Sequence, residues 1–181
     1  SGECEWAKGI VGISDDIINS VAETSDGGLI AGGYFRLFSV NLGNGVSLEN
    51  NGHEDGMIIK FEKTELQNLV TTQAKVIGGG YDDSINSVAK TRDGGLIAVG
   101  SFKYDTIDLG NGVSLENNGR EDGMIIKYNS RGECEWAKGI GGDDYDFINS
   151  VAETSDGGII VGGYFKSDSI DLGNGVSLSS N

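Results

Sequence analysis

The chain has 181 residues, and its 28 acidic side chains outnumber 13 basic ones to give a formal net charge of −15. A surface of this charge repels phosphate, so a nucleic-acid partner is disfavoured. No window approaches the roughly 18 consecutive apolar residues of a membrane span, and no basic-then-apolar leader opens the chain, so membrane insertion is not expected. Glycine occurs 31 times and proline is absent, so turns must depend on Gly, Asn and Asp.

The first predicted elements are short strands rich in β-branched and aromatic residues. One covers residues 3–10 and another 17–23. The turn at 26–28, Asp-Gly-Gly, suits a hairpin because both residue types tolerate positive φ. The run at 29–35 is continuously apolar, which predicts a strand buried on both faces.

An insertion of about 20 residues follows this strand. It contains Asn44-Gly45 between alternating apolar residues at 40–48, which predicts a small extra hairpin. The third strand of the unit is predicted at 57–61, directly after Asp55-Gly56, and the fourth, the counterpart of 3–10, at 70–77.

The same elements then recur along the chain. The tetrapeptide Asn-Ser-Val-Ala stands at 19–22, 86–89 and 149–152, which gives offsets of 67 and 63 residues. The turn and the extra hairpin keep these offsets, so the chain is a repeat array with a unit of about 65 residues.

No segment of useful length has helical periodicity, so the chain is predicted to be all-β. Four short antiparallel strands per unit are typical of a β-propeller blade, and just under three units predict an incomplete ring within one chain. The predicted division is an outer strand at 1–15 that closes a preceding or partner blade, blade 1 at 16–82, blade 2 at 83–145 and a partial blade 3 at 146–181.

A longer pattern resembles a known family. Residues 122–144 are DGMIIKYNSRGECEWAKGIGGDD, and residues 148–165 are INSVAETSDGGIIVGGYF. Together they resemble the bacterial β-propeller repeat called the seven-bladed β-propeller (SBBP) repeat, and the resemblance covers nearly the whole chain. It implies a secreted or cell-surface bacterial protein, usually without assigned chemistry. The departure lies at 70–77, where Gln73 replaces Trp and four extra residues precede the strand.

An incomplete ring has consequences for assembly. Propeller rings generally hold four to eight blades, so fewer than three cannot close alone. Apolar end faces and unpaired strand edges promote association. We therefore expect a homo-oligomer or the continuation of a longer repeat array, rather than a stable monomer.

Three aligned aspartates, Asp16, Asp83 and Asp146, precede the first strand of each unit. Two interpretations are open. A single aligned carboxylate is most often a turn cap that accepts backbone N–H bonds. Its oxygen also suits Ca²⁺, so these residues are calcium candidates, and no other cofactor is expected.

Other reactive side chains are few. Cys4 and Cys134 occupy equivalent positions, too far apart for a disulfide, and are interpreted as small buried hydrophobes. His53 is the only histidine and has Arg120 as its counterpart, so it is interpreted as a solvated loop residue. We predict no catalytic residue, because no nucleophile stands in an activating setting.

Aromatic residues recur at strand positions, which favours a place in the core between blades over a sugar-stacking surface. The residues concerned are Trp6, Trp136, Tyr34 and Tyr164.

Two functions remain open. The favoured one is a noncatalytic secreted or cell-surface module for structural assembly and protein or glycan binding, since near-identical units suit repetitive building. The alternative is part of a carbohydrate-active propeller enzyme whose catalytic residues lie outside these residues or between subunits.

Overall fold

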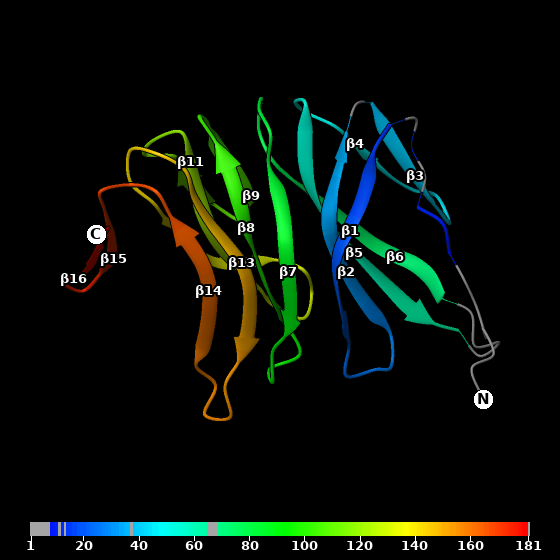
Figure 1. Cartoon of the computed structure of the whole chain (residues 1–181). Coiled ribbons are helices and arrows are strands. Elements are labelled where there is room, and N and C mark those ends of the chain that lie inside the picture. Colours follow the sequence, from blue (N-terminus) through cyan, green and yellow to red (C-terminus); the bar gives the residue numbers. More distant parts are fainter. Residues whose placement is uncertain (1–7, 11, 13, 37, 65–68, 181) are drawn as a thin grey trace, which may run out of the picture.

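The computed structural model describes residues 8–10, 12, 14–36, 38–64 and 69–180 (Figure 1). Within these residues the chain forms antiparallel strands and turns and contains no helix, which confirms the all-β prediction. Most strands pair with a neighbour from the same unit, so each unit forms its own small sheets.

The first two units each form a four-stranded sheet in which the predicted strands pair in chain order. Sheet 1 has the order β1 (Asp16–Glu23), β2 (Leu29–Arg36), β5 (Glu54–Lys63) and β6 (Leu69–Ile77). Sheet 2 has the order β7 (Ser84–Lys90), β8 (Leu96–Lys103), β11 (Glu121–Tyr128) and β12 (Cys134–Ile140). The third unit contributes hairpin 3, made of β13 (Asp146–Glu153) and β14 (Ile159–Phe165).

The extra hairpin predicted from Asn-Gly is present in all three units. The three copies are β3 (Ser39–Gly43) with β4 (Val46–Glu49), β9 (Thr106–Gly110) with β10 (Val113–Glu116), and β15 (Ser169–Gly173) with β16 (Val176–Ser179). Their turn residues Asn44, Asn111 and Asn174 have φ of 54°, 55° and 53°, the left-handed region that the turn requires.

The Asp-Gly-Gly turns also have the predicted conformation. In the first, Gly27 has a φ of 80°, and Asp26 Oδ1 accepts hydrogen bonds from the Thr24 hydroxyl and the Gly28 N–H. These bonds lower the pKa of Asp26, with the Thr24 bond as the largest cause. The turn is therefore held by its own side chains.

The first strand of each unit carries a bulge at the shared asparagine, because the pairing register shifts between Ile18 and Ser20 and at the equivalent places in β7 and β13. Opposite the first bulge, a side chain on Gly33 would overlap the Ile17 carbonyl. Glycine is thus required there by the close approach of two backbones.

Sheet 1, sheet 2 and hairpin 3 pack face to face in series (Figure 1). At junction 1, between sheets 1 and 2, β7 packs against β1, β2 and β5. At junction 2, between sheet 2 and hairpin 3, β13 packs against β7, β8 and β11. Both junctions have an apolar core. Ile30, Ile58, Ile85 and Val88 belong to one core cluster, and Ile97, Val99, Ile125 and Ile148 form another.

Burial on both faces, predicted for the second strand of every unit, holds for β2 and β8 but is wrong for β14. Ile30 is 6% exposed, whereas its counterpart Ile160 is 63% exposed, because no sheet among the described residues covers that face of hairpin 3. The described sheets form no closed ring, so the propeller arrangement stays a prediction. The strand predicted at 3–10 lies largely outside the described residues, as do Cys4 and Trp6.

Candidate functional site

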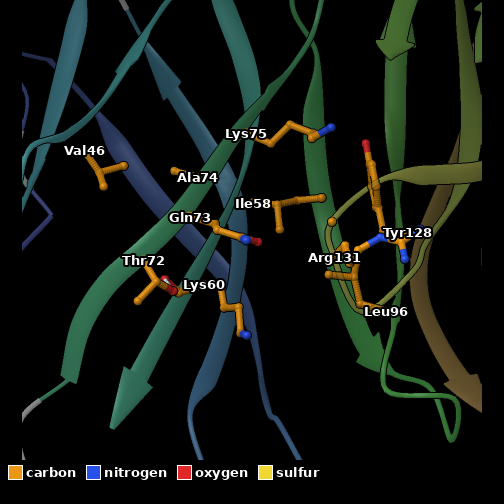
Figure 2. Close-up of a pocket in the computed structure, with 11 residues that line it drawn as sticks. Val46, Ile58, Lys60, Thr72, Gln73, Ala74, Lys75, Leu96, Tyr128 and Arg131 are labelled. Atoms are coloured by element: carbon orange, nitrogen blue, oxygen red, sulfur yellow. Dashed lines mark hydrogen bonds between the residues drawn. The ribbon is translucent and has the colours of Figure 1, made fainter. Parts of the chain in front are cut away.

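A groove lies between sheets 1 and 2 and has a volume of about 320 Å³ (Figure 2). We call it the junction groove. One wall comes from β5 and β6, and the other from sheet 2, including the turn after β11. Its lining consists of Val46, Ile58, Lys60, Thr72, Gln73, Ala74, Lys75, Leu96, Tyr128, Arg131 and Gly132.

The junction groove carries three cations and no carboxylate in its described lining. Lys60 Nζ lies 3.2 Å from a Glu62 oxygen, and Arg131 lies 2.7 Å from Glu133, so two of the cations already have acidic partners at the surface. Lys75 Nζ lies 5.0 Å from the centroid of the Tyr128 ring and forms no ion pair within the described part of the chain. The groove thus combines an apolar floor with cationic donors in a strongly acidic protein.

Two side chains of the junction groove, Gln73 and Tyr128, carry polar groups that bear on ligand binding. Gln73 occupies the strand position that Trp136 holds in sheet 2, since Gln73 pairs with Lys60 as Trp136 pairs with Lys127. The smaller amide leaves room that an indole would fill. Across the groove, the Tyr128 hydroxyl is buried without a hydrogen-bond partner in the described structure, and burial raises the pKa of Tyr128 well above its ordinary value.

The calcium candidates all bind backbone N–H groups. Asp16, Asp83 and Asp146 accept from the residue four positions earlier, Gly12, Gly79 and Gly142 respectively. Asp146 also accepts from the backbone N–H of Lys166 and from the Ser167 hydroxyl. These bonds favour the capping interpretation. Among the described residues, no group of three or more His, Cys, Asp or Glu side chains could hold a metal ion.

At each junction a second buried carboxylate, which was not among the predicted site residues, lies beside the capping aspartate. Asp55 is fully buried, and its Oδ1 and Asp83 Oδ2 both lie beside Gly78, where an added side chain would strike them. Burial raises the pKa of Asp83 to about 7, with contributions from the charges of Asp55 and Asp82. Burial also raises the pKa of Asp55, whose Oδ1 has no hydrogen-bond partner among the described groups.

The second junction repeats this pair. Asp122 is fully buried, its pKa is raised by burial and by the charge of Asp146, and its Oδ1 lacks a partner in the described structure. The available signal was the recurrence of Asp55-Gly56 as Asp122-Gly123, each directly before a predicted strand.

The bulged asparagines link one unit to the next. Asn19 Nδ2 donates to the Ile85 carbonyl at 2.9 Å, and Asn86 Nδ2 donates to the Ile148 carbonyl at 3.0 Å. The bulge turns each side chain toward the following sheet, as bulges commonly re-aim side chains. Their recurrence was visible in the sequence, but their contact with the next unit was not.

The remaining candidates lie apart from the junction groove. His53 is exposed, as predicted, and its Nδ1 lies 2.7 Å from Asp82 Oδ1. Cys134 is a buried free thiol whose pKa is raised by burial, which agrees with a small core residue. The core placement is wrong for Trp136 and Tyr164, which are 40% and 49% exposed, because no neighbouring sheet among the described residues covers them.

No model of a known protein family matches the chain, and no curated protein matches it. The described part of the chain contains no helix that is long and apolar enough to cross a membrane.

Proposed function

We propose that this chain is a noncatalytic β-propeller repeat module that serves structural assembly and binds a glycan in the junction groove. The observation that carries the proposal is the groove itself, which opens where Gln73 replaces the tryptophan of the other units. Sheets that pack in series through the same kind of junction support the assembly role. The sequence resemblance favours a secreted or cell-surface location in a bacterium.

The lining of the junction groove suits a sugar with acidic groups. Its volume of about 320 Å³ falls within the range of small-molecule sites, which favours a glycan over a protein surface. Thr72 and Gln73 offer hydrogen-bonding groups, and Lys75 offers a cation without a carboxylate partner in the described structure. An apolar floor that includes Ile58 and Leu96 can contact the ring face of a sugar.

A binding role agrees with the described chemistry better than an enzymatic one. Hydrolysis of a glycosidic bond needs two carboxylates that flank it, and no carboxylate lines the described groove. The thiol of Cys134 is buried with a raised pKa, which disfavours the reactive thiolate. The alternative of a carbohydrate-active enzyme therefore gains no support from the described residues.

A reciprocal pair of substitutions tests the binding role. The chain is screened against an array of neutral and acidic oligosaccharides, and the affinity of the best ligand is measured by calorimetry. Gln73→Trp places an indole where sheet 2 already accommodates one, so the fold should persist while the groove fills. We expect the affinity to fall at least roughly tenfold, because the indole would occupy the space in which the ligand makes its contacts.

The matched control is Trp136→Gln, which makes the opposite change at the equivalent strand position outside the junction groove. This variant should bind as the unchanged chain does. The proposal fails if no oligosaccharide binds the unchanged chain, or if Gln73→Trp binds the ligand with unchanged affinity.

A further inference from the structure

Junction 1 joins two complementary faces. The outgoing face, on sheet 1, includes Asn19, Ile30 and Gly32, and the incoming face, on β7, presents Ile85 and Val88. A side chain on Gly32 would begin 2.7 Å from both Ile85 and Val88, so glycine forms a socket for them. Ile85 is fully buried and Val88 is 5% exposed in this arrangement.

The chain carries a second outgoing face without a partner. On hairpin 3, the residues equivalent to Asn19, Ile30 and Gly32 are Asn149, Ile160 and Gly162, so the glycine socket is reproduced. Ile160 is 63% exposed, and nearby Tyr164 is 49% exposed. The Asn149 side chain has no hydrogen-bond acceptor within the described part of the chain, although Asn19 and Asn86 each donate to the next unit.

A second incoming face is equally exposed at the other end of the series. Ile18 and Val21 on β1 are the same residue types as their counterparts Ile85 and Val88, and they are 36% and 62% exposed. They border a hollow of about 150 Å³ that is also lined by Leu29, Ala31 and Phe61. An apolar sheet face of this kind is characteristic of a binding surface.

The two open faces match each other as the two faces of junction 1 do. Gly162 offers the space that Gly32 offers to an isoleucine and a valine, and β1 supplies those two side chains. Asn149 can donate to the Ile18 carbonyl, the counterpart of the Ile85 carbonyl that Asn19 binds. In sheet 2 the counterpart of Gly32 is Val99, so junction 2 has no glycine socket. Hairpin 3 has Gly162 there and thus resembles sheet 1 rather than sheet 2.

We propose that the outgoing face of hairpin 3 binds the incoming face of β1 in a second copy of this chain, so that copies associate head to tail. The interface is heterologous, because different surfaces meet, and each added copy presents a fresh outgoing face. The inference rests on the assembly part of the proposed function and specifies its partner. A second copy is the occupant because the side chains that fit the socket stand on this same chain.

Two charge substitutions test the interface. Val21→Arg alters only the incoming face, and Ile160→Arg alters only the outgoing face. Both side chains are more than half exposed, so neither change should unfold the chain, which circular dichroism checks. We expect the unchanged chain to associate with rising concentration in sedimentation equilibrium, and each variant to stay at 19.0 kDa.

Mixing the two variants gives the decisive readout. In an equimolar mixture, the intact outgoing face of Val21→Arg meets the intact incoming face of Ile160→Arg, so we expect a 1:1 dimer that grows no further. Tyr104→Arg is the matched control, because Tyr104 is 52% exposed in the turn between β8 and β9, away from both faces, and it should associate normally. Ile18→Lys and Tyr164→Lys provide a second pair should one variant lose its fold.

Several outcomes overturn the proposal. They are an unchanged chain that remains a monomer at hundreds of micromolar, a variant that associates as the unchanged chain does, and a mixture that forms no dimer. Glycan binding measured on the monomeric Val21→Arg variant separates the two proposals. We expect this variant to lose association and to keep its glycan binding. If it binds no glycan, that result counts against the glycan ligand alone and not against the interface.

Discussion

Two carboxylates buried side by side cannot both ionise without an energetic cost. At junction 1 the pair is Asp55 and Asp83, and burial raises the pKa of both, that of Asp83 to about 7. The unperturbed value is 3.8, so between about pH 4 and pH 7 the folded chain binds more protons than the unfolded chain. The contribution of this pair to stability therefore falls as pH rises through this window.

Asp55→Asn should raise stability at pH 8 and flatten its decline between pH 5 and pH 8. The amide keeps an oxygen for the Asn51 N–H, which Asp55 Oδ2 accepts now, and puts a donor in place of the partnerless Oδ1. Removing one charge should raise the free energy of unfolding at pH 8 by about 1 kcal/mol, which corresponds to a pKa shift of about one unit. Urea unfolding at both pH values measures it.

The control for this prediction is Glu116→Gln, which removes one negative charge at an exposed position. It should leave the pH profile of stability unchanged. An Asp55→Asn variant that loses as much stability between pH 5 and pH 8 as the unchanged chain would show that the buried pair does not set the profile.

Single residues at the junctions were the hardest part to predict. The capping interpretation of Asp83 came from its place before a strand, but its neighbour Asp55 lies 28 positions earlier and meets it only through sheet packing. The junction groove could not be predicted for the same reason, since Gln73 and Tyr128 come from different sheets. The replacement of Trp by Gln was visible in the sequence, but its effect on space was not.

At the scale of strands and turns, sequence and structure agree closely because the determinants are local. Left-handed φ values were expected and occur at Gly27, Gly94 and Gly157 and at the three Asn-Gly turns, where only a few residue types are tolerated. Phe38 and Tyr104 also have φ of 65° and 50°, which their residue type did not predict. Burial is different, because it depends on a neighbour. Ile30 and Ile160 share residue type and strand position, yet only Ile30 is covered by another sheet.

The bulged asparagine gives an element-scale prediction with a control inside the chain. Asn86→Ala should lower the free energy of unfolding by about 1 kcal/mol, because the Ile148 carbonyl loses its donor at junction 2. Asn19→Ala should act similarly at junction 1. Asn149→Ala makes the same change where no following sheet is described, so chemical denaturation at low micromolar concentration should detect no loss.

Equal losses from all three alanine variants would contradict this prediction. They would mean that the asparagine stabilises the bulge within its own strand rather than the link to the next sheet. The same Asn149→Ala variant should weaken association of copies at high concentration, where its side chain acquires a partner.

At the scale of the whole molecule, the charge balance decides how stability responds to salt. With 28 acidic and 13 basic side chains, 15 negative charges have no positive charge to balance them. Ion pairs such as Lys103–Asp82, at 3.0 Å, and Arg131–Glu133, at 2.7 Å, are partly or largely exposed, and pairs of that kind contribute little. Repulsion spread over the surface should therefore outweigh the pairs.

Raising sodium chloride from about 0.02 M to about 0.3 M should therefore stabilise the chain, because the screening length falls from about 20 Å to about 6 Å and removes more repulsion than attraction. We expect the melting temperature to rise by about 2–4 °C, equivalent to about 1 kcal/mol. Scanning calorimetry on the monomeric Val21→Arg variant measures this without a contribution from association. A melting temperature that falls with salt would show that the few ion pairs stabilise the fold more than the excess charge destabilises it. Because the same repulsion separates copies, salt should also strengthen head-to-tail association of the unchanged chain.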